Sequence, residues 1–153
     1  MSTPPEPAGP VLLFDGECGL CNRVVRLLLR LDRRGRLRFA PLQGPAAQGF
    51  LHAHGLPVED FSTLVFVPDW ARSASSGRAR REDPEFLLRT DGAIAALRAG
   101  GGAGRWLAAV LAIVPRRLCD AGYKFVARTR YRIFGPWKAC PLPRPEWAAR
   151  FLE

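Results

Sequence analysis

Two cysteines separated by two residues are the part of this sequence best suited to chemistry. Cys18 and Cys21 stand where a short apolar run gives way to a helical pattern. At a helix N-terminus, unpaired N–H groups and the helix dipole stabilise an anion, and the thiol pKa values of such pairs fall to roughly 3.5–7.5. The spacing predicts a pair that alternates between dithiol and disulfide. We expect Cys18, at the exposed end, to attack a disulfide and Cys21, one turn inward, to resolve the mixed disulfide.

Asp15 lies three residues before Cys18, at the end of the apolar run. One interpretation makes its carboxylate the acceptor of the Cys21 proton during resolution. The other makes Asp15 a turn residue whose carboxylate accepts hydrogen bonds from nearby backbone N–H groups. The spacing supports both equally. The predicted catalytic set is therefore Cys18, Cys21 and Asp15.

The elements that would position these residues begin with a βαβ unit. Val11–Phe14 is apolar throughout, which is typical of a strand buried on both faces. From Gly19 to Leu31, apolar residues recur every three or four positions, which predicts an amphipathic helix that ends before Gly35. Residues 37–39 alternate between apolar and polar side chains, and they predict a second strand.

The middle of the chain continues with a helix, two strands and another helix. We expect these elements at Pro45–His54, Thr63–Val67, Glu85–Thr90 and Asp91–Ala99. The two strands are expected to pair with each other, and Asp91 is a good N-cap residue for the last helix. Residues 68–84 are polar and not periodic, which predicts a long loop.

The C-terminal third of the chain is helical in pattern. A glycine-rich joint at residues 100–104 precedes two expected helices, at Arg105–Val114 and Arg116–Ile133. Pro115 separates the two helices, and Gly135-Pro136 ends the second. A Pro-rich tail follows.

The order of elements predicts an α/β protein with a thioredoxin-like fold: a βαβ unit, a short helix, a β-hairpin and a helix, with a helical C-terminal extension. A length of 153 residues with 48% hydrophobic residues indicates one globular domain and excludes a wholly disordered chain. Within it we expect a disordered tail at 1–9, the thioredoxin-like core at 10–100, and the extension at 101–153 packed on the core.

The residues around the cysteines resemble the signature of a known family. Phe14–Asn22, with Asp15, Cys18 and Cys21 inside it, is similar to the motif of the DCC family of predicted thiol-disulfide oxidoreductases. The C-terminal half also resembles that family, at Ile113–Arg116, Asp120 with Tyr123, Arg130-Tyr131, Phe134-Gly135, and Cys140 with Leu142-Pro143. The resemblance covers about residues 11–152. It implies a thioredoxin-like fold and redox roles for the two cysteines, with Asp15 beside them.

A redox pair of this kind holds its electrons in its own sulfur atoms, so we expect no cofactor. The substrate would be a protein or small-molecule disulfide or thiol. Met1–Pro10 has neither the basic nor the apolar region of a secretory signal, and the apolar run Trp106–Val114 is too short to span a membrane. We therefore expect a cytoplasmic protein without a transmembrane segment, in which the cysteines do not form structural disulfides.

The formal net charge of +9 is concentrated near the C-terminus. Residues 104–153 hold ten basic and three acidic side chains, against thirteen and eleven in residues 1–103. One interpretation is that the basic C-terminal helices contact an anionic membrane peripherally. The other is an ordinary amphipathic helix docked on the core with a solvated arginine face. We do not expect nucleic acid as a partner.

Two other functions remain open at this point. The chain could be a non-enzymatic, redox-sensing or binding module that docks on a membrane or protein partner through its basic helices. A small metal-binding protein is the second alternative. It is disfavoured because Cys119 and Cys140 form no second close pair. We expect Cys119 to be a small buried residue and Cys140 to be structural or a third thiol near the site. His52 and His54 are two residues apart, on different faces of a helix, and make poor ligands.

Overall fold

The apolar run near the start of the chain forms the central strand of a four-stranded mixed sheet. The computed structural model describes residues 9–59, 63–75, 86–135 and 145–152. The strands β1, β2, β3 and β4 span Val11–Phe14, Arg38–Pro41, Val65–Val67 and Leu87–Leu88. β1 pairs in parallel with β2 and antiparallel with β3, and β3 pairs antiparallel with β4, so the strand order is β2-β1-β3-β4. Because β1 has neighbours on both edges and packed layers on both faces, all four of its residues are buried.

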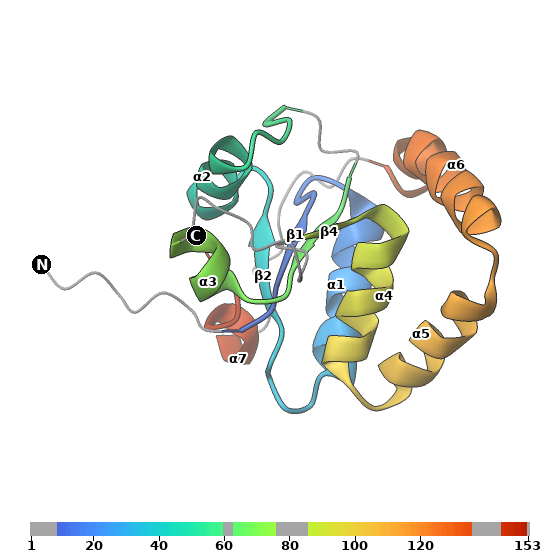
Figure 1. Ribbon diagram of the computed structural model, residues 1–153, viewed down its shortest axis with the longest axis horizontal. Coiled ribbons are helices and arrows are strands. Elements are labelled where there is room, and N and C mark those ends of the chain that lie inside the picture. Colours follow the sequence, from blue (N-terminus) through green and yellow to red (C-terminus); the bar gives the residue numbers. More distant parts are fainter. Residues whose placement is uncertain (1–8, 60–62, 76–85, 136–144, 153) are drawn as a thin grey trace, which may run out of the picture.

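Helices cover both faces of this sheet (Figure 1). On one face lie α1, α4 and α5, at Gly19–Leu31, Arg89–Gly100 and Ala103–Ile113. On the other lie α2 and α3, at Pro45–Ala53 and Trp70–Ser75. Side chains of β1 alternate between the two cores, since Leu12 and Phe14 pack with α1 and α4 while Val11 and Leu13 pack with α2. The sheet thus separates two apolar layers.

The helices after the glycine joint match the sequence pattern closely. Gly101 and Gly102 have φ of +69° and +53° and connect α4 to α5. After the break at Pro115, α6 spans Arg116–Phe134 and packs against α1 and α4. Gly135, with φ of +67°, ends α6, and its N–H donates to the Tyr131 carbonyl at 3.1 Å.

Three expectations for the middle of the chain were wrong in part. The loop expected over residues 68–84 contains helix α3, and the strand expected over 85–90 is shortened to β4. Asp91 is not the N-cap residue, because α4 already begins at Arg89. Arg89 takes a φ of +53° and its N–H donates to the Leu64 carbonyl at 3.1 Å, which turns the chain out of the strand two residues early. The absence of a side chain at Gly92 permits this, because a Cβ there would lie 2.7 Å from the Leu87 carbonyl oxygen.

The end of the C-terminal extension, which was expected to be Pro-rich and to pack on the core, contacts the sheet. A short helix, α7, spans Pro145–Ala148, and Phe151 then forms a parallel bridge with Phe39 of β2. The Phe39 N–H donates to the Arg150 carbonyl, and the Leu152 N–H donates to the Phe39 carbonyl, both at 2.8 Å. Arg150 also forms a buried ion pair with Asp32, just after α1. The end of the chain therefore covers the outer edge of β2.

This α/β arrangement, a βαβ unit followed by a helix, an antiparallel strand pair and a helical C-terminal region, is a thioredoxin-like fold. The predicted fold class is confirmed. None of the helices in the described ranges is long and apolar enough to span a membrane.

Candidate active site

Both cysteines lie at the N-terminus of α1, where the chain leaves the central strand. Cys18 is the N-cap residue, with φ −88° and ψ 119°, and its Sγ accepts a hydrogen bond from the N–H of Cys21 at 3.4 Å. The N–H of Cys18 in turn donates to the Asp15 carbonyl at 3.3 Å. The Cys18 sulfur thus occupies the position that a Ser or Asp oxygen takes at many helices, and the first turn of α1 stabilises negative charge on it.

Polar side chains hold the turn that carries Cys18. Asn22 is buried, and its Nδ2 donates to the carbonyls of Gly16 and Cys18 at 2.8 and 3.0 Å. Gln43, just beyond β2, accepts the Gly16 N–H at 3.0 Å and donates to Asp15 Oδ1 at 2.8 Å. The turn is therefore fixed from α1 on one side and from the end of β2 on the other.

The two thiols have pKa values that move in opposite directions. The pKa of Cys18 falls from 9.0 to about 6, because the Cys21 thiol and the Cys21 N–H both donate to its sulfur and Arg130 is close, although burial acts the other way. The pKa of Cys21 rises because its thiol donates to Cys18, because it is buried, and because the Cys18 charge opposes a second one. At neutral pH the negative charge therefore lies on Cys18 and the shared proton on Cys21.

The expectation that Cys18 is the exposed member of the pair is wrong for this conformation. Cys18 has no exposed surface, whereas Cys21 is partly exposed. The end of α6 contributes to this burial, since a Cβ on Gly19 would lie only 2.7 Å from the Phe134 carbonyl oxygen. The Arg23 guanidinium also lies 5.3 Å from the centre of the Phe134 ring. The last turn of α6 thus rests directly on the first turn of α1.

This contact predicts that Gly19→Ala loosens the cover over Cys18. The added methyl would press against a backbone oxygen, and overpacking of this kind costs about 1–3 kcal/mol. We expect a lower free energy of unfolding and faster modification of Cys18 by iodoacetamide at a pH where it is a thiolate. Gly49→Ala in α2 is the control, because its Cβ would meet nothing within 4 Å and should stabilise the protein slightly. Equal modification rates in the two variants would contradict the role of the α6 contact.

Asp15 is buried and fully engaged by hydrogen bonds and an ion pair. Its Oδ1 accepts the N–H of Glu17 at 3.0 Å as well as the Gln43 amide. Its Oδ2 accepts the Tyr131 hydroxyl and lies 3.3 Å from Arg130 Nη2. The bond to Glu17 is the turn interaction expected from the sequence, while the contacts with α6 place the carboxylate in a larger network.

Arg130 joins that network to the cysteine pair. Its Nη1 lies 3.5 Å from Cys21 Sγ while its Nη2 pairs with Asp15, and the side chain is 8% exposed. Its guanidinium also stacks 4.8 Å from the centre of the Tyr131 ring. The pKa of Tyr131 is raised by burial and by its bond to Asp15, so the hydroxyl remains a donor. A cation from α6 therefore faces both the Cys21 thiol and the Asp15 carboxylate.

A small cavity opens beside Cys21. Its volume is about 150 Å³, and it lies between α1, α4, α6 and the residues before β3. Most of the lining is apolar, with Asp15, Cys21 and Arg130 supplying polar atoms, and Tyr123 closes one side by accepting the Leu64 N–H at 3.0 Å. Cys21 thus borders a mainly apolar space of the size of a small apolar group.

Comparison with known proteins agrees with this geometry. Residues 12–136 match the family described as DCC1-like thiol-disulfide oxidoreductase. The chain belongs to this family. It is 34% identical over 142 residues to the uncharacterized protein YuxK of Bacillus subtilis, covering 93% of each chain. It is 29% identical over 133 residues to the DCC family protein At1g52590, chloroplastic, of Arabidopsis thaliana, covering 87% of this chain and 69% of that one. No solved structure shows significant similarity.

Among the described residues of this DCC1-like protein, Cys119 is the other cysteine, and it does not join the pair. Cys119 lies on α6, and its Sγ is 3.8 Å from the carbonyls of Leu111 and Val114. It is only partly buried, not fully buried as expected, and it borders a separate cavity of about 710 Å³ beside α4 and α5. Cys140, for which the sequence suggested a structural role or a third thiol, lies outside the described residues.

Other polar residues of the DCC1-like chain lie away from the site. His54 stacks on Phe50, with ring centres 4.0 Å apart, and its Nδ1 is 2.9 Å from the Phe50 carbonyl, while His52 is exposed. These positions agree with solvated or capping roles. In the described ranges, no group of three or more His, Cys, Asp or Glu side chains could hold a metal ion.

Proposed function

We propose that this protein is a thiol-disulfide oxidoreductase in which Cys18 attacks and Cys21 resolves. The hydrogen bond from the Cys21 N–H to Cys18 Sγ, at the N-terminus of α1, is the observation that carries the proposal. It accompanies a Cys18 pKa of about 6, so this thiol is ionised at neutral pH. The thiolate is the form that attacks disulfides. Family membership supports a thiol-disulfide redox role.

The reaction balances with the two cysteines alone. The Cys18 thiolate attacks one sulfur of a substrate disulfide, which forms a mixed disulfide and releases the other sulfur as a thiolate. Cys21 then loses its proton and attacks Cys18 Sγ, which closes the Cys18–Cys21 disulfide and releases the second substrate sulfur. Two electrons pass to the substrate, and the released thiolates take up the protons. A dithiol reductant restores the pair, and the reverse sequence oxidises a substrate dithiol.

The second step needs a charge on Cys21, and Arg130 is placed to stabilise it. Once Cys18 is in the mixed disulfide, its negative charge no longer opposes ionisation of Cys21. The guanidinium 3.5 Å from Cys21 Sγ then favours the new thiolate. We assign Asp15 as the acceptor of the Cys21 proton, because it is a buried carboxylate that borders the same cavity as Cys21. The transfer requires one of the donors on its Oδ2, Tyr131 or Arg130, to move away and free a lone pair.

The low pKa of Cys18 predicts how pH acts on the reduced protein. Thiolate absorbance should titrate with a midpoint near pH 6 and disappear in Cys18→Ser. The pKa in the folded state lies below the unfolded value, so Cys18 stabilises the reduced fold fully above about pH 9 and loses that contribution as pH falls through about 6. Relative to Cys18→Ser, the free energy of unfolding should therefore rise with pH across this window, by at most about 4 kcal/mol. A flat difference would contradict the assignment.

Turnover of a model disulfide tests the function directly. With dithiothreitol as the electron donor, the protein should accelerate the reduction of bis(2-hydroxyethyl) disulfide and of insulin above the uncatalysed rate. Cys119→Ser is a suitable control, because this thiol borders the other cavity and should not affect turnover. Acceleration that survives in Cys18→Ser, or no acceleration with either substrate, would contradict the proposal.

A redox-sensing module is the second candidate, and the complete burial of Cys18 favours it. A sensor needs its pair to oxidise and change a contact, and the last turn of α6 rests on the turn that holds the pair. The turnover assay separates the two functions. A sensor would form the Cys18–Cys21 disulfide stoichiometrically with an oxidant and yet show no turnover.

We also propose a reducing compartment, the cytoplasm, as the site of action. A reducing compartment would keep the Cys18–Cys21 pair as a dithiol, the form that reduces disulfides. Rapid acid trapping and alkylation in growing cells should find the pair mainly reduced. A fully oxidised pair would contradict the proposal.

A further inference from the structure

Exposed apolar side chains are concentrated on the two helices that follow the glycine joint. Among the described residues, Val24 and Leu27 of α1 are the large exposed apolar side chains outside this region. The others are Trp106, Leu107, Val110, Ile113, Val114, Leu118, Phe125, Val126, Tyr131 and Ile133. Trp106 is 79% exposed and Ile113 82% exposed, so these side chains are almost completely solvated. Single exposed apolar residues are common on proteins, but such a concentration marks an interaction surface.

The helix α5 is oriented so that most of its large side chains face outward, with Leu111 packed partly against the core. Its buried residues are the small Gly104 and Ala108, which face α4. Trp106, Val110 and Ile113 recur at intervals of four and three residues, so they lie on one face of the helix, away from the core. An ordinary surface helix buries its large apolar residues and exposes polar ones. In α5 the small residues are buried and most of the large apolar ones are exposed, so the folded chain leaves an apolar face of α5 in contact with solvent.

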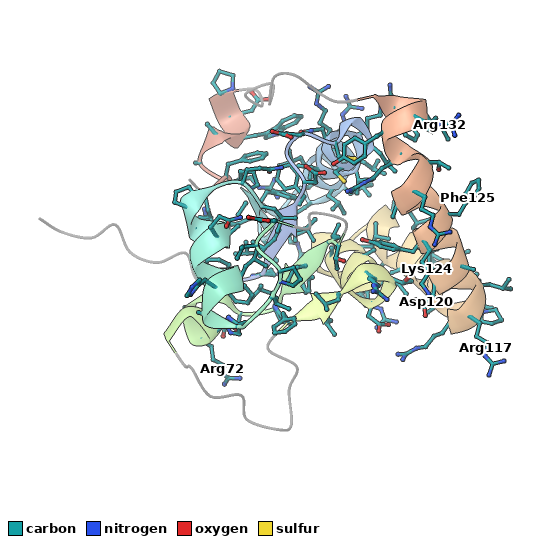
Figure 2. All side chains as sticks on the ribbon, turned by 90° about the horizontal axis from the view of Figure 1, so that it is seen from above. Arg72, Arg117, Asp120, Lys124, Phe125 and Arg132 are labelled. Atoms are coloured by element: carbon teal, nitrogen blue, oxygen red, sulfur yellow. The ribbon has the colours of Figure 1, made fainter. Side chains whose placement is uncertain are left out.

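The helix α6 adds a row of basic residues beside an apolar row. Arg117, Lys124, Arg128 and Arg132 lie along one side of its outward surface, next to Leu118, Phe125 and Ile133. Figure 2 shows Arg117, Phe125 and Arg132 projecting from α6 away from the rest of the molecule. The helix contains six basic residues and one acidic residue, Asp120. In the part of the chain that the structure describes, these four exposed basic residues form no salt bridge with a carboxylate.

We infer that this surface, formed by the outward faces of α5 and α6, docks on an anionic lipid bilayer. An interfacial helix combines a bulky apolar face, a Trp near the headgroups and basic residues that meet lipid phosphates. A second copy of the chain would bring one basic row against another. Nucleic acid would match the charge but not the exposed Ile113, Leu118 and Ile133 side chains. The inference is independent of the cysteine chemistry, and it would place the α1 pair beside a membrane surface.

Vesicle sedimentation of the full-length protein tests this inference. At low salt, the protein should sediment with vesicles of equal parts phosphatidylglycerol and phosphatidylcholine, but not with phosphatidylcholine alone. Binding should fall sharply at about 0.5 M salt, where the Debye length is only about 4 Å. Lys124→Gln/Arg128→Gln should weaken partitioning about thirtyfold, from about 1 kcal/mol per basic residue near an anionic surface. Ile113→Ser/Phe125→Ser should weaken it by about tenfold or more, because both side chains would insert.

Matched controls make the outcome decisive. Arg72→Gln removes a basic residue from α3, on the opposite side of the molecule, and should bind vesicles like the wild type (Figure 2). Quenching of tryptophan fluorescence by brominated acyl chains should be reduced in Trp106→Phe. All substitutions are of exposed residues, and circular dichroism should show unchanged folding. Three results would overturn the inference: no sedimentation at low salt, sedimentation unaffected by both double variants, or dimerisation that only the apolar double variant abolishes.

Discussion

The Cys21→Ser protein is expected to stop at the mixed disulfide. In this variant Cys18 retains the backbone N–H of residue 21 and the nearby Arg130, so it still attacks a substrate disulfide. No second thiol is then placed to release the product. Incubation with bis(2-hydroxyethyl) disulfide should therefore add one mercaptoethanol unit to the protein, visible by mass spectrometry and removed by dithiothreitol. Steady-state turnover should fall to near the uncatalysed rate, because removal of a covalent catalytic group costs on the order of a thousandfold or more.

The matching variants assign each thiol. Cys18→Ser should form no adduct at the pair and should show no turnover, since the thiol at the N-cap of α1 is lost and burial still raises the pKa of Cys21. Cys119→Ser should behave as the wild type. The reverse pattern, an adduct in Cys18→Ser and none in Cys21→Ser, would make Cys21 the attacking thiol. Its partial exposure and its position on the 150 Å³ cavity would then be the reason.

The parts of the fold that were predictable from sequence are those that local patterns determine. The apolar run Val11–Phe14 predicted β1, because a strand buried on both faces has apolar residues at every position. The three- and four-residue periodicity of Gly19–Leu31 predicted α1, because a helix buried on one face repeats its apolar residues at that spacing. Gly135 likewise marked the end of α6, since its positive φ favours glycine.

The parts that were not predictable depend on distant partners. Phe151 adds to the edge of β2 only because Phe39, more than a hundred positions earlier, presents its backbone there. The early start of α4 depends on the Arg89 N–H, just after β4, bonding to the Leu64 carbonyl, just before the neighbouring strand β3. Such contacts have no local pattern, and the Pro-rich composition of the C-terminal tail did not indicate a bridge to β2.

The residues of the site also divide into those that are close in sequence and those that come from distant positions. Asp15, Cys18 and Cys21 lie within seven residues of the sequence and were found. Arg130 was named only as part of the family resemblance and received no role, although the structure buries it beside the cysteines. The spacing of the helix could have indicated that Arg130 is buried. Tyr123, Ala127, Arg130 and Phe134 recur every three or four residues, and they share the inward face of α6. Burial of Cys18 could not be foreseen, since its cover comes from residues over a hundred positions away.

Replacing Arg130 is expected to affect both the acidity of Cys18 and the stability of the fold. Arg130→Met leaves Asp15 buried without its ion pair, and breaking a buried pair in this way costs about 3–5 kcal/mol. It also removes the guanidinium that lowers the pKa of Cys18, so the thiolate titration should move upward from about pH 6. Resolution should slow by about 10–100-fold, the effect of losing one hydrogen bond to a charged group.

Additional variants separate electrostatics from damage to the fold. Asp15→Asn/Arg130→Met removes both partners, so most of the stability should return while the Cys18 titration stays displaced upward. Arg130→Lys should lower the pKa of Cys18 part of the way back toward its wild-type value. The lysine keeps a positive charge near the pair, but it cannot contact Cys21 and Asp15 through two nitrogens at once. Arg132→Gln, on the exposed side of α6, should change neither quantity. A titration midpoint that stays near pH 6 in folded Arg130→Met would show that the backbone of α1 and the Cys21 thiol alone account for the acidity of Cys18.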